Sequence, residues 1–268
     1  MKPHHHHNNH TRILALLALA LAALQPALPA PAQPSAPAQP ATAPANTATQ
    51  PCPRDPKWVK RHEGFVETAN AKPAANCQIL FIGDSITDFW LSKTRGAPDI
   101  WQKYFGRYNP VNLGISGDRT QHVLWRLQNG ELGVMRPKAI VLMIGTNNTG
   151  YEPDKTTPRN TPAETAEGVK SIIAYLRATL PDAKILLLAI FPRGNPADLQ
   201  RAQVAEINAL IRPLHDGKTI YYLDIGAKFL TPDGAIPKTI MPDLLHPNAA
   251  GYQLWADAIA APLSALLK

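Results

Sequence analysis

Three short runs of almost wholly apolar residues constrain the fold of this chain more than any other feature of its sequence. They cover residues 79–82, 138–144 and 184–190, and each ends at a glycine or at a proline-containing turn. A strand that is covered by helices on both faces is apolar at nearly every position, whereas a strand with one solvated face alternates. The runs therefore predict strands of a parallel sheet that is buried on both sides.

Helical patterns separate these strands. Residues 111–113 and 219–223 are two weaker strand candidates, and apolar residues recur at helical spacing within segments 123–127, 169–180, 204–214 and 252–266. Thr161-Pro162-Ala163-Glu164 is typical of a helix start. The alternation predicts one α/β domain with three layers, α/β/α, around a five-stranded parallel sheet of flavodoxin-like order. In such a sheet the functional site lies beyond the carboxyl ends of the strands.

The N-terminal part of the chain has a different composition. Of the 27 prolines, 11 fall within the first 56 residues. Residues 1–32 are predicted to be a signal peptide, because Ile13–Leu24 is an apolar core of about 12 residues and Ala30-Pro31-Ala32 resembles a cleavage site. Residues 33–56 are predicted to be a disordered linker rich in proline and alanine, and residues 57–268 the globular domain. We therefore expect export to the periplasm or out of the cell.

The N-terminal residues leave one question open and exclude two kinds of membrane anchor. The histidines at 4–7 are either a tag or a natural feature, and no metal site is inferred from them. The apolar core is shorter than the ~20 residues that span a bilayer, and Cys52 is too far from it to carry a lipid. We therefore expect no stable membrane anchor.

The net charge limits which partners the protein can bind, and the cysteine count limits which disulfides it can form. The net charge of +7 falls to about +5 without Lys2 and Arg12, and no run of basic residues indicates a nucleic-acid partner. Cys52 and Cys77 are the only cysteines. In an oxidising compartment they are candidates for a disulfide that closes a loop of ~25 residues, with two free thiols as the alternative.

Residues with chemical function follow the predicted strands. Gly83-Asp84-Ser85 comes after the first strand, and Asp243-Leu244-Leu245-His246 comes before the last helix. A serine hydroxyl becomes a good nucleophile when a base removes its proton, and His246 is a candidate for that base. Asp243 is placed to accept the proton on the other ring nitrogen, so that Ser85, His246 and Asp243 form a candidate catalytic triad.

Acyl transfer also requires hydrogen-bond donors for the oxyanion. Three candidates are the backbone N–H of Ser85, the backbone N–H of Gly117 and the side-chain amide of Asn147. Asn148 is available to form the turn while Asn147 donates. This chemistry requires no cofactor and no metal ion.

Together these motifs resemble the four sequence blocks of the SGNH (GDSL-type) hydrolases. The stretch 112–132 is similar to the catalytic subunits of the intracellular platelet-activating-factor acetylhydrolase group, and the resemblance extends over roughly residues 79–267. It implies the SGNH hydrolase fold, a metal-free serine esterase and the roles given above. It also implies an acyl pocket at Ile86, Thr146 and Leu245, whose medium size is compatible with an acetyl group, and it leaves a homodimer open.

The sequence thus predicts an exported serine esterase for short-chain, acetyl esters, with O-acetyl groups on carbohydrate or small esters as substrates. Because the related intracellular enzymes have no export signal, their lipid substrate and their partners are not transferred to this chain. Two alternatives remain. One is a lipase or thioesterase for longer acyl chains, and the other is a non-catalytic surface-binding module on the same fold.

Overall fold

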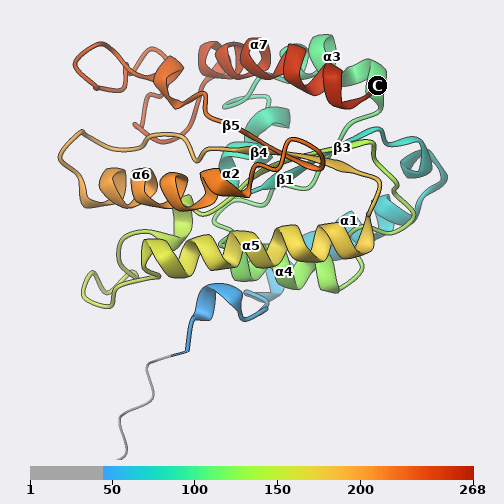
Figure 1. Cartoon of the computed structure of the whole chain (residues 1–268), viewed down its shortest axis with the longest axis horizontal. Helices are drawn as coiled ribbons and strands as arrows, with labels where there is room; N and C mark the ends of the chain where they lie inside the picture. Colours follow the sequence, from blue (N-terminus) through green and yellow to red (C-terminus); the bar gives the residue numbers. More distant parts are fainter. Residues whose placement is uncertain (1–44) are drawn as a thin grey trace, which may run out of the picture. The chain divides into compact units, whose positions relative to one another are not determined.

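The computed structural model describes residues 45–268 (Figure 1). The predicted signal peptide and residues 33–44 of the predicted linker lie outside this range. None of the helices within it has the length and apolar character needed to cross a membrane. In chain order the helices and strands are α1 (Pro56–Asn70), β1 (Ile79–Gly83), α2 (Ser85–Asp88), α3 (Pro98–Phe105), β2 (Val111–Asn112), α4 (Thr120–Gln128), β3 (Ala139–Met143), α5 (Pro162–Thr179), β4 (Lys184–Leu188), α6 (Leu199–Ile211), β5 (Ile220–Leu223) and α7 (Ala249–Leu266).

The five strands form one parallel sheet in the order β2-β1-β3-β4-β5. The register pairs Ile79 with Ala139, and Ala139 in turn with Lys184, so the central strands begin at one level. Every residue of β1 and β3 is buried. The predicted flavodoxin-like order and the burial of both sheet faces are confirmed.

Helices cover both faces of the sheet, as Figure 1 shows. One face packs α4, α5 and α6 against alternate strand residues such as Leu80 and Leu142. The other packs α3 and α7 against the intervening residues, among them Phe81 and Val141. Because alternate strand residues point to opposite faces, both sets must be apolar, which is why the runs in the sequence are continuous.

Local signals fix where individual helices begin. The Thr161 hydroxyl accepts the N–H of Glu164 at 3.2 Å, and the Glu164 carboxylate accepts the N–H of Thr161 at 2.8 Å. This capping box, followed by Pro162 in the first turn, starts α5 where the sequence predicted a helix start. Asp55 caps α1 in a similar way, through the N–H groups of Lys57 and Trp58.

The structure corrects the N-terminal boundary of the domain. Residues 45–55, which we call the strap, were predicted to be disordered linker, and this prediction is wrong. The strap contains the short 3-10 turn η1 (Thr47–Thr49) and packs on α4 and α5, where Ala48 is fully buried (Figure 1). The Ala48 carbonyl accepts the Thr120 hydroxyl at 2.8 Å, and the Asn160 amide donates to the Thr47 hydroxyl at 2.8 Å. These hydrogen bonds hold a segment that has little apolar surface of its own.

The structure also contradicts the predicted disulfide, because Cys52 and Cys77 are both free thiols. Cys52 lies beside the start of α4, where its N–H donates to the Gln121 carbonyl at 3.4 Å. Cys77 is buried directly before β1, at the amino ends of the strands, whereas the start of α4 follows the carboxyl end of β2. The 15-residue helix α1 runs between them and spans ~22 Å. A disulfide requires Cα atoms within ~7 Å, so closeness along the chain does not suffice.

Candidate active site

Ser85 lies at the carboxyl end of β1, as the first residue of α2. The backbone just before it has no room for a side chain, because a Cβ added to Gly83 would lie 2.5 Å from the Met143 carbonyl oxygen of the neighbouring strand. Glycine is therefore required there by the close approach of β1 and β3. Ser85 is the start of a helix, where backbone N–H groups have no acceptor within the helix. Its hydroxyl and its N–H are thus presented at the same edge of the sheet.

His246 and Asp243 reach the same edge from the turn before α7. Ser85 Oγ lies 2.9 Å from His246 Nε2, and His246 Nδ1 lies 2.7 Å from Asp243 Oδ2. The other oxygen of Asp243 accepts the backbone N–H groups of Leu245 and His246 at 3.1 and 2.7 Å. Leu244 takes a left-handed conformation with φ of 58°, which tightens this turn. One carboxylate therefore orients both the imidazole and the backbone that carries it.

The protonation of Asp243 decides the tautomer of the imidazole. Partial burial opposes ionisation of this carboxyl, but the hydrogen bonds from the backbone and ring of His246 outweigh it and hold its pKa below the usual value. An ionised carboxylate can only accept hydrogen bonds, so Nδ1 of His246 carries a proton. In a neutral ring Nε2 is then the acceptor for the Ser85 hydroxyl. This is the state from which a serine can be deprotonated.

Gly117 and Asn147 stand at the ends of the two neighbouring strands. Gly117 is exposed and has a φ of 82°, a conformation that favours glycine. Asn147 belongs to the 3-10 turn η5 (Thr146–Asn148) after β3, and its side-chain amide donates to the Asp118 carbonyl at 3.0 Å. One hydrogen of the amide therefore ties the two loops together, and the second is available to a ligand.

Asn148 stabilises the turn after β3, as the sequence analysis suggested. Its side chain is fully buried, and its amide donates to the side chains of Thr120, Gln121 and Asn160 at 2.9 to 3.1 Å. Its side-chain oxygen accepts the backbone N–H of Thr120 at 3.1 Å. Asn148 thus joins the turn after β3 to the start of α4, which leaves Asn147 at the surface of the site.

The three predicted acyl-pocket positions have different surroundings. Ile86 is buried in the apolar cluster beneath α7, and Leu245 is partly buried against the same cluster. Thr146 is buried, and its carbonyl and hydroxyl oxygens accept Nη1 of Arg193 at 3.0 and 3.2 Å. Ile86 and Leu245 are therefore brought to one apolar region, whereas Thr146 is fixed by a cation. Their role in an acyl pocket stays a prediction.

A buried ionic cluster, which sequence reasoning missed, supports the Gly117 loop. The Asp118 carboxylate accepts Trp58 Nε1 at 2.7 Å, Arg126 Nε at 2.9 Å and Arg54 Nη1 at 3.2 Å. Arg126 is fully buried and is also paired with Glu131. Asp118, Arg126 and Glu131 stand in the stretch 112–132 that the sequence indicated, but no pattern there showed that they pair. Arg54 and Trp58 come from the strap and from α1, so no spacing in the sequence indicated their contact with Asp118.

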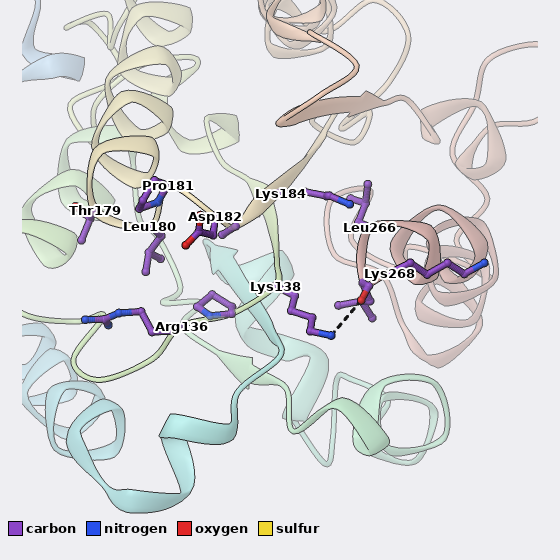
Figure 2. A pocket seen from close by; sticks show the side chains of 12 residues that line it. Arg136, Lys138, Thr179, Leu180, Pro181, Asp182, Lys184, Leu266 and Lys268 are labelled. Atoms are coloured by element: carbon purple, nitrogen blue, oxygen red, sulfur yellow. Dashed lines mark hydrogen bonds between the residues drawn. The ribbon is translucent and has the colours of Figure 1, made fainter.

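Two hollows help to locate the site. One of about 620 Å³ lies beside the triad and is lined by His246, Asp243, Lys93, Arg95 and the start of α7. The other, of about 530 Å³, lies at the amino ends of the strands, around Arg136, Lys138 and Lys184 (Figure 2). The described residues that line the second hollow include no serine, cysteine or histidine. The first hollow, which His246 and Asp243 line, is therefore the candidate site for a substrate.

A serine, a histidine and an aspartate in hydrogen-bond contact, at the carboxyl edge of a parallel sheet, define a site of the serine-hydrolase class. The sequence profile of the GDSL-like Lipase/Acylhydrolase family matches residues 81–254. The chain belongs to this family, and it is a carboxylic ester hydrolase. The predicted family resemblance is thereby confirmed.

Individual relatives agree with this assignment. The chain is 36% identical over 199 residues to platelet-activating factor acetylhydrolase IB subunit alpha2 of Rattus norvegicus, a match that covers 74% of this chain and 80% of the relative. It is 33% identical over 228 residues to subunit alpha1 of Homo sapiens, covering 83% and 91%. The structure of an acetyl xylan esterase has the same fold at 19% identity, with a TM-score of 0.57 over 69% of this chain and 99% of that one.

Proposed function

We propose that this protein is an exported acetylesterase that removes O-acetyl groups from carbohydrate or from small esters. The observation that carries the catalytic part of the proposal is the 2.9 Å contact between Ser85 Oγ and His246 Nε2, continued by the 2.7 Å contact to Asp243. These distances allow a proton to pass from the serine to the imidazole while the serine attacks.

The proposed mechanism uses an acyl-enzyme. Ser85 Oγ forms a bond to the ester carbonyl carbon, and its proton moves to His246 Nε2. The N–H groups of Ser85 and Gly117 and the amide of Asn147 donate to the oxyanion that forms. The intermediate collapses by breaking the bond to the alcohol, which leaves with the proton from His246. Water then attacks the acyl-enzyme by the same route, and the acid and free Ser85 result.

The catalytic assignment is tested by Ser85→Ala. We expect this variant to lose turnover of p-nitrophenyl acetate while its thermal unfolding stays that of the wild type. A matched control is Ser264→Ala, since Ser264 lies on α7 at the other end of the fold, beside Lys103 and Tyr108. Wild-type turnover in Ser85→Ala would contradict the assignment.

The preference for acetyl is supported by the medium size of Ile86, Thr146 and Leu245 and by the acetylhydrolases among the relatives. A series of p-nitrophenyl esters from acetate to octanoate measures it, and kcat/KM is expected to be highest for acetate. Leu245→Ala, at a partly buried position, is expected to shift the optimum toward longer chains. An octanoate optimum in the wild type would favour the alternative, a lipase or thioesterase.

The substrate and the location are supported by different features. The predicted signal peptide argues for a substrate outside the cytoplasm, and the acetyl xylan esterase shows that the fold can serve a polysaccharide ester. Release of acetate from acetylated xylan, compared with the same xylan after chemical deacetylation, tests the substrate class. Sequencing of the mature N-terminus from the expressing cell tests export, and a start after Ala32 is expected.

A further inference from the structure

Arg54, near the end of the strap, reaches the loop that presents Gly117. Its Nη1 donates to the Ser116 carbonyl at 2.8 Å and to Asp118 Oδ1 at 3.2 Å. A Cβ added to Gly117 would lie 3.2 Å from both Nη1 and Nη2, so the guanidinium packs directly against this glycine. A residue from outside the sheet is thus in contact with a proposed oxyanion donor.

The contact with Ser116 is significant because of peptide geometry. The carbonyl of Ser116 and the N–H of Gly117 belong to one planar peptide group, in which they point in opposite directions. A hydrogen bond that fixes the carbonyl therefore also fixes the direction of the N–H. A cation on the carbonyl side also polarises the group, which makes its N–H a stronger donor.

Further hydrogen bonds fix the rest of the loop that carries Gly117. Asp88 Oδ2 accepts the N–H and the hydroxyl of Ser116 at 3.0 and 2.8 Å, and Asn147 donates to the Asp118 carbonyl. Within residues 45–268 the N–H of Gly117 has no acceptor. It is the one N–H of the 116–118 stretch that the described part of the chain leaves for a ligand, since the N–H of Asp118 donates to Ile115 at 3.1 Å.

We propose that Arg54 is a positioning residue for ester hydrolysis, which aims and polarises the Gly117 N–H through the Ser116–Gly117 peptide. The strap is then part of the working enzyme and not a tether that precedes it. This inference rests on the proposed function, because it requires Gly117 to donate to the oxyanion.

The inference predicts a particular kinetic change. Loss of a complete oxyanion donor lowers kcat by ~10²–10³-fold, so a donor that is present but poorly aimed should lower it by roughly 10–100-fold. KM should change little, since the interaction strengthens only as the oxyanion forms. Arg54→Lys can keep one of the two hydrogen bonds and should recover part of the loss.

The experiment compares kcat, KM and thermal unfolding for the wild type, Arg54→Ala, Arg54→Lys, Asn147→Ala and the double variant Arg54→Ala/Asn147→Ala. The matched control is Arg107→Ala, which removes an exposed arginine next to Tyr108, at the amino end of the sheet. We expect Arg54→Ala to lower kcat at unchanged KM, and the double variant to lose less than the product of the single losses, because both residues act on one loop.

The outcomes separate this inference from the function on which it rests. If Asn147→Ala is impaired but Arg54→Ala keeps wild-type kcat, with or without a lower unfolding temperature, the positioning role is refuted and the proposed function stands. If Asn147→Ala also keeps wild-type kcat, the proposed oxyanion hole fails and the role of Arg54 falls with it. Should Arg54→Ala not fold, Arg54→Lys carries the test: a kcat partly below that of the wild type at unchanged KM supports the positioning role, and a wild-type kcat refutes it.

Discussion

Asp84, the residue before Ser85, is expected to make the protein less stable as the pH rises. Its side chain is 1% exposed and has a hydrogen bond from the Ile86 N–H at 2.9 Å. Burial raises the pKa of this carboxyl from 3.8 to about 7, despite that hydrogen bond and the attraction of Arg193. Between these pH values the folded state keeps a proton that the unfolded state has released, so the free energy of unfolding falls with increasing pH.

The size of the effect follows from the two pKa values. Above pH 7 the difference between the two pKa values corresponds to a loss of about 4 kcal/mol in the free energy of unfolding. Most of this loss, about 3 kcal/mol, develops between pH 4.5 and 8. Asp84→Asn removes the ionisation and keeps an oxygen for the Ile86 N–H. Relative to the wild type, the variant is therefore expected to gain about 3 kcal/mol of stability over this pH range.

Urea unfolding followed by tryptophan fluorescence at pH 4.5, 6 and 8 measures the change. At a slope of ~3 kcal/mol per M, the midpoint of Asp84→Asn should move by ~1 M against the wild type between the extremes. Asp182→Asn, at an exposed position remote from the site, is the control and should show no such trend. Parallel stability curves for the wild type and Asp84→Asn would refute the reasoning, because they would mean that Asp84 ionises in the folded state as it does in the unfolded one.

Three further predictions concern the triad, the strap and the thiols. Asp243→Asn should lower kcat on p-nitrophenyl acetate by ~10²–10⁴-fold, because the imidazole loses the acceptor that selects its tautomer, and steady-state kinetics measures this. Gly168→Ala should lower the free energy of unfolding by ~1–3 kcal/mol, because the new Cβ would lie 2.7 Å from the Ala48 carbonyl oxygen and push the strap off α5. Urea titration measures this, and an unchanged midpoint would contradict the packing of the strap. Reducing agent should leave the unfolding temperature unchanged, and Cys52 should react with a thiol reagent faster than buried Cys77, whose pKa burial raises to about 11.

The sheet could be predicted from the sequence because burial on two faces leaves a direct mark on it. Residues 79–82, 138–144 and 184–190 are almost wholly apolar because helices cover both sides, and the structure has β1, β3 and β4 there. The triad residues could be predicted because parallel strands bring their carboxyl ends to one edge, so Ser85 and His246 meet although they are far apart in the chain.

The strap and its contacts could not be predicted, because they depend on hydrogen bonds and not on apolar periodicity. Ala48 is the only residue of the strap that is fully buried, and Arg54 meets the Ser116 carbonyl across a separation of 62 residues. Nothing in the composition of this segment distinguishes it from a tether. The disulfide prediction failed for a related reason, since nearness in sequence says nothing about the helix that separates Cys52 from Cys77.

The order of the site residues along the chain has a consequence for protein synthesis. Ser85 is made before the other two, and Asp243 and His246 lie 158 and 161 positions later, just before α7. A growing chain that ends after β5 holds the nucleophile without a base. Hydrolytic activity therefore begins only after the turn that carries Asp243 and His246 has been made and has folded against the end of β1, so a shorter nascent chain is inactive.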